Sequence, residues 1–407
     1  MARMLRWVAL GLLASVTAQA APGDRWTTAW WTSQLALDGQ NALPAADLTD
    51  ATLRQIVRLQ GPATRLRVRF SNRFGTAPLR IDGATIARAV DVASPRIDAA
   101  TLRPLRFGGA AAVTIPAGAD YWSDPVALKA AAGADLAISL YVAQPPAQQT
   151  GHPGSRATSY LVHGDHSGDA DLRGAKTVDH WFQIAGIEAV APKARAIVAF
   201  GDSITDGYGV KPNTNARWTD ALQRRLRAAP GLAEVAVLNA GIGGNRLLND
   251  GLGPNALARF DHDVIGQPGV THLIVLEGVN DLGTLTRDAP VAPEAHTALV
   301  ARMIDAYRQI VARAHARGIK AIGATIMPYA GSAYYHPDAQ NEADRQAVNR
   351  WIRTPGNFDA VIDLDAAMRD PGDAKRLRKD YDSGDGLHPS VAGYAAMAQA
   401  VPLAVLR

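Results

Sequence analysis

The sequence feature that most constrains the fold is a change of hydropathy pattern at Ala191-Pro192-Lys193. Beyond this tripeptide, short apolar runs alternate with longer stretches whose apolar residues recur at helical spacing, as in residues 295–316. Such alternation predicts a parallel sheet with helices on both faces. The expected strands are 196–200, 235–238, 273–276, 321–326 and 360–362, and the expected helices are 216–228, 255–265, 295–316, 339–353 and a segment after Pro389.

The preceding part of the chain has the pattern of a β protein. Residues 64–70 alternate apolar and basic side chains, which is the period of a strand with one wet face, and residues 136–142 do the same. Many such short runs, separated by Gly, Pro and Asp, are typical of an antiparallel sandwich. With 407 residues in all, we expect a jelly-roll-like β-sandwich over 24–190 and an α/β domain over 194–407.

Five tryptophans fall in the β part of the chain. Their flat rings could form a platform for sugars, or they could fill the core and the boundary between the domains. We favour the core, because each ring buries a large apolar area. The loop over residues 151–156 is expected near the mouth of a site. The tryptophans are Trp26, Trp30, Trp31, Trp122 and Trp181.

The first twenty residues have the pattern of a signal peptide. Arg3 and Arg6 precede an apolar run over 7–16, and Ala18-Gln19-Ala20 is a small-residue cleavage pattern. A short membrane anchor is the alternative, but the apolar run is too short to span a bilayer comfortably. We therefore expect a secreted or periplasmic protein, mature from about residue 21 and without a membrane anchor after cleavage.

Charge and cysteine content exclude several function classes. The formal net charge is +4, and cleavage of a leader carrying two arginines leaves +2. This is too mild to indicate nucleic acid or an anionic membrane as a partner. The chain has no cysteine, so disulfides, thiol catalysis and cysteine-based metal sites are excluded.

Gly201-Asp202-Ser203 directly follows a run that reads as a buried strand. A serine at this position lies at the carboxyl edge of a parallel sheet, where α/β proteins bind their ligands. Its backbone N–H can also point at a developing oxyanion. Taken alone, the tripeptide is equally typical of a turn.

Two further blocks follow later strands. Residues 239–245 include Gly241, Gly243 and Gly244, which allow a ligand to approach the backbone closely. A phosphate-binding loop is the rival interpretation, but neither of its usual glycine patterns is present. In the block 278–281, the Asn280 amide can point into the same cleft, although asparagine also caps helices.

The last block is Asp385-Gly386-Leu387-His388, ahead of the expected C-terminal helix. Its spacing can bring the carboxylate of Asp385 to Nδ1 of His388 while Nε2 stays free. This arrangement suits an orienting acid and a general base. A structural histidine beside a helix start is the alternative.

The four blocks in this order resemble the GDSL esterase/lipase family of the SGNH-hydrolase superfamily, with Ile204 in place of the Leu in the family name. The resemblance implies a three-layer α/β/α domain over about 194–407. It also implies Ser203 as nucleophile, His388 as base and Asp385 as its partner. The oxyanion hole would comprise the N–H groups of Ser203 and Gly244 and the Asn280 side chain, the second donor being open to a shift of one residue to Gly243. No metal or organic cofactor is implied.

The physical roles of nearby residues follow from their positions. Asp202 and Asp281 are expected to hold their loops, and Asp206 and Arg246 to lie at the rim of the site.

The combination of a β domain and a hydrolase domain is similar to exported bacterial enzymes that deacetylate plant polysaccharides such as xylan. Residues 239–246 and 325–329 resemble that subgroup. We therefore expect a serine esterase acting on short-chain acyl esters, with an acylated carbohydrate as substrate. A lipase or lysophospholipase is one alternative, although no stretch after residue 20 reads as an amphipathic lid. A non-catalytic carbohydrate-binding protein on the same scaffold is the other.

Overall fold

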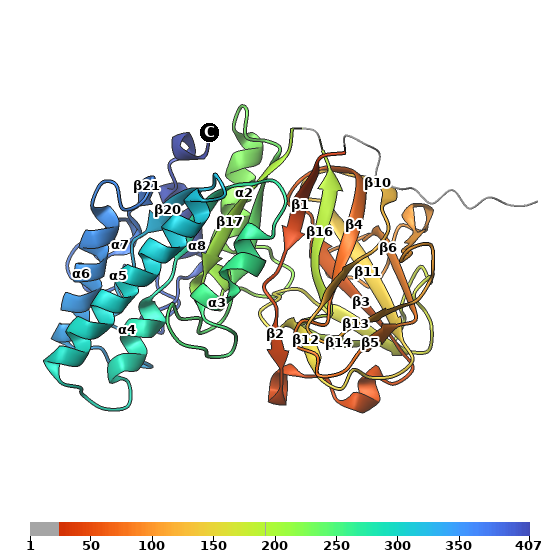
Figure 1. Ribbon diagram of the computed structural model, residues 1–407, viewed down its shortest axis with the longest axis horizontal. Helices are drawn as coiled ribbons and strands as arrows, with labels where there is room; N and C mark the ends of the chain where they lie inside the picture. The colour runs from red at the N-terminus through yellow and green to blue at the C-terminus, as the bar shows by residue number, and fades with distance from the viewer. Residues whose placement is uncertain (1–23, 192) are drawn as a thin grey trace, which may run out of the picture.

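The computed structural model describes residues 24–191 and 193–407, in two parts that lie side by side (Figure 1). The part drawn in red to yellow-green is all β, and the part drawn in green to blue alternates strands and helices. The signal peptide expected at 1–20 lies outside the described residues. Among the described residues, no helix combines the length and hydropathy that a membrane span requires.

The all-β part has two main antiparallel sheets. The runs expected at 64–70 and 136–142 are the strands β4 (Ala63–Ser71) and β11 (Asp135–Val142), one in each sheet. Their apolar faces meet in one core, which includes Val68, Phe70 and Ile138. The β-sandwich prediction is therefore confirmed.

The first sheet has the order β1-β16-β4-β10, with β9 also paired to β4, and comprises β1 (Trp26–Trp31), β16 (Ile184–Val190), β4, β10 (Val126–Ala130) and β9 (Asp120–Trp122). The second has the order β14-β13-β3-β11-β6-β7 and comprises β14 (Lys176–Val178), β13 (Ser159–His163), β3 (Ala51–Arg58), β11, β6 (Gly83–Arg88) and β7 (Arg103–Pro104). Smaller sheets pair β15 (Trp181–Phe182) with β12 (Gln149–His152) and β2 (Leu35–Leu37), and β5 (Leu79–Ile81) with β8 (Val113–Ile115). Short 3₁₀ turns are η1 (Gly39–Asn41), η2 (Ala45–Leu48) and η3 (Ala99–Thr101).

Three of the five tryptophans are buried, as the core interpretation predicts. Trp30 packs edge-on against Trp181, with ring centroids 5.0 Å apart. Trp31 belongs to the core of the neighbouring α/β part, so it joins the two halves of the molecule. Trp26 and Trp122 are half-buried, and the Arg67 guanidinium lies over both rings.

The α/β part is built on a five-stranded parallel sheet. The strands lie in the order β18-β17-β19-β20-β21, and helices form a layer on each face of the sheet. Helices α2 and α8 pack together on one face, with α7 against α8, while α5 packs against α3 and α6 on the other. The three-layer fold predicted from the sequence is confirmed.

The strands are β17 (Arg195–Gly201), β18 (Val235–Gly241), β19 (Val270–Leu276), β20 (Lys320–Ala324) and β21 (Ala360–Ile362). The helices are α1 (Ser203–Asp206), α2 (Trp218–Ala228), α3 (Ala256–Phe260), α4 (Val279–Thr286), α5 (Pro293–His315), α6 (Ala339–Arg353), α7 (Leu364–Met368) and α8 (Val391–Ala400), with a π-helical turn η4 (Asp261–Ile265) and a 3₁₀ turn η5 (Leu403–Leu406).

Two expected elements differ in detail. The strand predicted at 321–326 ends at Ala324, because the Ile326 N–H binds the side chain of Asn349 on α6 and so leaves the ladder. The helix predicted at 255–265 is α3 followed by the π-helical turn η4.

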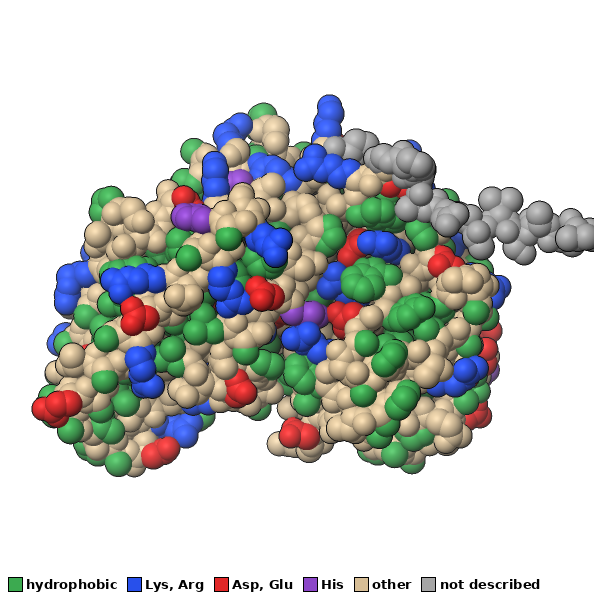
Figure 2. Space-filling view, viewed as in Figure 1, with side chains coloured by type: hydrophobic (Ala, Val, Ile, Leu, Met, Phe, Trp, Pro, Cys, Tyr) green, Lys and Arg blue, Asp and Glu red, His purple; other side chains and the backbone are tan. Residues whose placement is uncertain are grey.

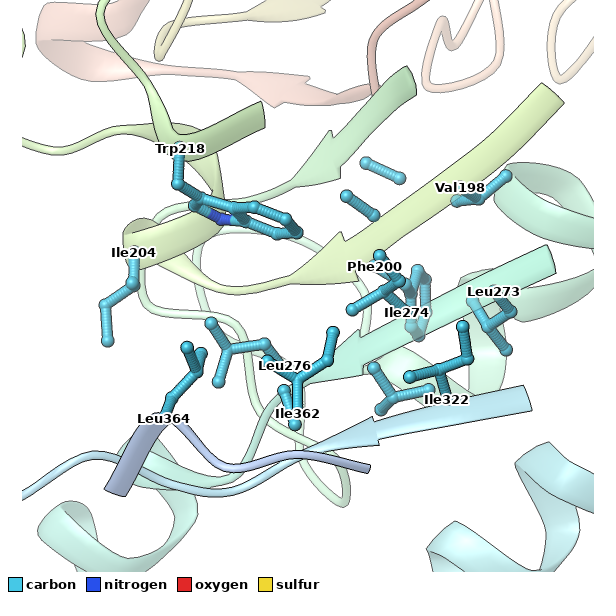
Figure 3. Close-up of a cluster of buried hydrophobic side chains, with 14 of the residues drawn as sticks. Val198, Phe200, Ile204, Trp218, Leu273, Ile274, Leu276, Ile322, Ile362 and Leu364 are labelled. Atoms are coloured by element: carbon cyan, nitrogen blue, oxygen red, sulfur yellow. The ribbon is translucent and has the colours of Figure 1, made fainter. Parts of the chain in front are cut away.

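The core of the α/β part explains why its strands read as continuous apolar runs. Both faces of a covered parallel sheet are buried, so its strands need apolar residues at successive positions. Val198 and Phe200 of β17, with Ile274 and Leu276 of β19, are almost fully buried, and Trp218 of α2 is buried close by (Figure 3). On the surface, charged side chains of both signs are interspersed over the face shown in Figure 2.

Gly241, the last residue of β18, is the point where this strand touches the turn of α1. A Cβ at this position would lie 2.2 Å from the backbone nitrogen of Asp206 and 2.8 Å from the carbonyl carbon of Thr205. Only glycine allows this approach, because backbone atoms cannot rotate away as side chains can.

We therefore expect Gly241→Ala to lower the free energy of unfolding by about 1–3 kcal/mol, the usual range for overpacking. Urea unfolding of the purified protein measures the change. Gly243→Ala is the matched control, since its Cβ would meet nothing closer than Leu252 Cδ1 at 3.7 Å. Equal stability of the two variants would contradict the packing argument.

Candidate active site

The blocks predicted from the sequence converge on one edge of the parallel sheet. Ser203 follows β17, the glycine-rich loop follows β18, and Asn280 lies in the first turn of α4 after β19. His388 reaches the same edge from the loop before α8. Together they line a cleft of about 590 Å³. Its predicted members are Ser203, Gly243, Gly244, Asn280, Asp385 and His388.

Ser203, His388 and Asp385 form a continuous chain of hydrogen bonds. Ser203 Oγ lies 2.9 Å from His388 Nε2, and His388 Nδ1 lies 2.6 Å from Asp385 Oδ2. A carboxylate only accepts, so Nδ1 carries the proton and Nε2 is free to accept from the hydroxyl. The other carboxylate oxygen, Asp385 Oδ1, accepts from the backbone N–H groups of Leu387 and His388 at 2.9 and 2.8 Å.

The turn that carries Ser203 is fixed by its own backbone. Asp202 caps α1, because its side chain accepts from the Ile204 N–H at 2.9 Å. Gly207 ends the turn in the left-handed region, with φ of +90°. Asp202 therefore holds its loop, as expected.

The glycine loop and Asn280 border the serine. Gly244 has φ of +66°, a conformation that favours glycine, and both Gly243 and Gly244 line the cleft. Asn280 is buried, and its Nδ2 donates to the backbone carbonyl of Asn245 at 2.7 Å. Asp281 accepts from the N–H groups of Leu247 and Leu248, so it holds the loop from below, as expected.

Burial dominates the ionisation of the acids beneath the cleft. It raises the pKa of Asp202 to about 7, with the Ile204 N–H opposing, and the pKa of Asp281 to about 6. Burial also raises the pKa of Glu277 well above its ordinary value, with the nearby Asp202 adding to the effect.

Arg259 on α3 is a central residue that motif analysis does not find. It is almost fully buried, and its guanidinium lies 4.0 Å from the centre of the Phe200 ring. All three of its nitrogens donate to groups at the strand ends and to the all-β part. The acceptors are Gly201 O, Ala240 O, Asn245 Oδ1, Glu277 Oε1, Asp263 Oδ2 and Ser33 Oγ.

The loop over residues 151–156 reaches the turn of the serine from the all-β part. His152 Nε2 lies 2.8 Å from Asp206 Oδ1, and His152 Nδ1 donates to the Ser33 carbonyl at 2.8 Å. Asp206 is thus buried against the β part, and its placement at the site rim is wrong. The reason is that the α1 turn points this side chain away from the cleft. Arg246, the other expected rim residue, is half-buried and donates to the Asp250 carbonyl.

Exposed apolar and aromatic side chains line the cleft beside the chain of hydrogen bonds. Tyr208 stacks on His388, with ring centroids 4.1 Å apart and an interplanar angle of 29°. Tyr208 is 49% exposed, and Leu252 and Tyr334, each 60% exposed, line the same cleft. Sequence patterns do not predict these residues, because each lies in a loop outside the recognised blocks.

Comparison with known families agrees with this geometry. Residues 199–396 match the model of the GDSL-like Lipase/Acylhydrolase family. This part of the chain is a GDSL-like lipase/acylhydrolase domain. The protein is accordingly a hydrolase of carboxylic esters. A search among curated proteins found no match.

Solved structures of GDSL proteins align with about half of the chain. A GDSL-like lipase from Bacteroides thetaiotaomicron is 20% identical, with 53% of this chain and 90% of that chain covered and a TM-score of 0.40. An acetylxylan esterase from Geobacillus stearothermophilus is 23% identical, with 51% and 91% covered and a TM-score of 0.39.

The imidazole of His388 has a shifted ionisation that can be measured. Burial lowers the pKa of His388 below its ordinary value of 6.5, the Asp385 carboxylate partly opposes this, and the Arg156 cation adds to the lowering. As the base that the sequence predicts, His388 would stay neutral to lower pH, so the acid limb of kcat/KM should have its midpoint below 6.5.

Removing the positive charge in Arg156→Ala should raise the His388 pKa and move this limb to higher pH. The profiles are best recorded at low ionic strength, where exposed charges are least screened. Arg173→Ala is the control, since that side chain is 93% exposed. An acid limb at or above 6.5, or equal limbs in the wild type and Arg156→Ala, would contradict the assignment.

Proposed function

We propose that the GDSL domain is a serine esterase that removes short acyl groups, acetyl in particular, from plant polysaccharide or oligosaccharide. Ser203 is the nucleophile, His388 the general base and Asp385 its partner. The observation that carries the proposal is the unbroken hydrogen-bond chain from Asp385 through His388 to Ser203 at an open cleft.

The first half of the reaction forms an acyl-enzyme. Ser203 Oγ attacks the ester carbonyl carbon while its proton passes to His388 Nε2, and Asp385 stabilises the resulting imidazolium. The negative charge on the carbonyl oxygen meets the N–H groups of Ser203 and Gly244 and the Asn280 amide. One such donor is typically worth about 10²–10³ in kcat. His388 then returns the proton to the leaving sugar oxygen as the ester bond breaks.

The second half releases the acid. Water loses a proton to His388 and attacks the acyl carbonyl, and the new tetrahedral species collapses as Ser203 Oγ regains the proton. The described side chains supply each proton transfer, so the chemistry requires only the ester and water.

The rings at the cleft support a carbohydrate as the leaving group. The exposed rings of Tyr208 and Tyr334 line the same cleft as Ser203. A flat ring complements the apolar face of a pyranose. Aromatic rings bury large areas at low entropic cost, which suits a substrate with few charges.

The organisation of the chain forms part of the proposal. Residues 24–190 are an accessory β domain and residues 194–407 the catalytic domain, because the two parts have separate cores. Residues 1–20 are a leader that directs the protein to the periplasm or the outside of the cell.

Ser203→Ala tests the nucleophile. The variant should fold normally and lose ester hydrolysis by roughly 10⁴-fold or more, since the residual rate comes from the rest of the site alone. Hydrolysis of p-nitrophenyl acetate and labelling by a serine-directed organophosphate are the measurements. A wild-type rate in the variant would refute the assignment. Absence of labelling in the wild type with retained sugar binding would instead favour the binding protein.

A substrate panel tests the leaving group and the acyl length. We expect acetate release from acetylated xylo-oligosaccharides to exceed hydrolysis of long-chain p-nitrophenyl esters in kcat/KM. Tyr334→Ala should raise KM for the oligosaccharide more than for p-nitrophenyl acetate, because only the sugar uses the ring. A preference for long acyl chains would identify a lipase-type acylhydrolase.

A further inference from the structure

The phenol of Tyr335 contacts the proposed oxyanion donor directly. Its hydroxyl donates to Asn280 Oδ1 at 2.6 Å, and both residues are buried while lining the cleft. We propose that Tyr335 is a positioning residue, which holds the Asn280 amide so that one N–H faces the developing oxyanion. The inference rests on the proposed function of the site.

The hydrogen bonds leave the Asn280 amide one orientation. The Asn245 carbonyl only accepts, so it must face Nδ2, which donates to it at 2.7 Å. The Tyr335 hydroxyl then binds Oδ1 on the other side of the amide. These two contacts occupy Oδ1 and one of the two Nδ2 hydrogens. The second Nδ2 hydrogen is left free to donate into the cleft. A flipped amide would place Oδ1 against the Asn245 carbonyl, where two acceptors repel.

A glycine in α4 brings the Tyr335 ring into place. Gly283 lies one turn after Asn280, and a Cβ there would be 2.4 Å from Tyr335 Cγ. A glycine inside a helix typically costs about 1 kcal/mol relative to alanine. Here it lets the ring lie directly on the helix that carries the amide. Tyr329 and Tyr334 contact the ring edge-to-face, with centroids 6.4 and 4.8 Å away.

The phenol remains a donor throughout the working pH range. Burial raises the pKa of Tyr335 above its ordinary value, so the hydroxyl keeps its proton. Loss of this hydroxyl leaves the ring packing intact but removes one of the two hydrogen bonds that hold the amide, so that the Asn245 carbonyl alone restrains it. A donor that must be reoriented as charge develops stabilises the transition state less than a fixed one.

Tyr335→Phe tests the role. We expect kcat for p-nitrophenyl acetate to fall by about 10–100-fold, which is a smaller decrease than the removal of one oxyanion donor typically causes. KM should change less than about threefold. Urea unfolding should show that the variant remains folded. The same variant in an Asn280→Ala background should cost almost nothing more, because the phenol acts only through the amide. An undiminished kcat, or an equal loss in both backgrounds, would overturn the proposal.

Tyr329→Phe is the matched control. Its hydroxyl is also buried in this tyrosine cluster, yet has no hydrogen-bond partner among the described residues. Its removal should leave kcat within about twofold, so a comparable loss would show that kcat responds to any change in the cluster and would overturn the assignment. An active Ser203→Ala would refute the proposed function itself, whereas an inactive Ser203→Ala beside an undiminished Tyr335→Phe refutes only the positioning role.

Discussion

The geometry of the site depends on the hydrogen bonds that the Arg259 guanidinium donates. Removing a charge from water costs several kcal/mol unless it is paired and fully hydrogen-bonded. Arg259 meets this condition by donating to the carbonyls that end β17 and β18 and to the Glu277 carboxylate after β19. It also binds the side chain of Asn245 in the glycine loop. One buried cation therefore fixes the relative positions of three strand ends, and with them the serine, the loop and the asparagine.

The β part takes part in this buried network. Ser33 Oγ donates to Asp263 at 2.7 Å and accepts from Arg259, while the Ser33 carbonyl accepts from His152. His152 in turn binds Asp206 on the turn that carries Ser203. Without the β part, Asp206 would lose its imidazole partner, and Asp263 would lose the Ser33 hydroxyl. Through these hydrogen bonds, the β part supports the turn that carries Ser203. It therefore does more than form a wall of the cleft.

Sequence patterns predicted the parts of the site that follow from strand ends. In a parallel sheet every carboxyl end lies at the same edge, so blocks after β17, β18 and β19 had to meet there. The pairing of His388 with Asp385 was predictable from their spacing. Arg259 and Tyr335 were not, because arginine and tyrosine have no local pattern that reveals them. Ser33 and Gly201 are 226 and 58 residues away from Arg259, and Asn280 is 55 residues away from Tyr335. Asp206 was misplaced because adjacency in sequence to Ser203 does not determine which side of a one-turn helix a side chain occupies.

The ionisation of the buried acids beneath the cleft affects the electrostatic environment of the proposed oxyanion. Asp202, Glu277 and Asp281 are buried close together, and Arg259 pairs directly with Glu277 and with a fourth buried acid, Asp263, so full ionisation would leave a net negative charge under the site. Burial raises the pKa of all three, most clearly that of Glu277, whose Oε2 has no hydrogen-bond partner among the described residues. A proton retained on Glu277 leaves Arg259 paired with the carboxylate of Asp263, whose pKa is lowered to about 2 against its burial by the His262 hydrogen bond and the Arg259 cation. In the proposed mechanism, a neutral Glu277 places one fewer buried negative charge near the proposed oxyanion donors, which favours the charge that develops on the substrate.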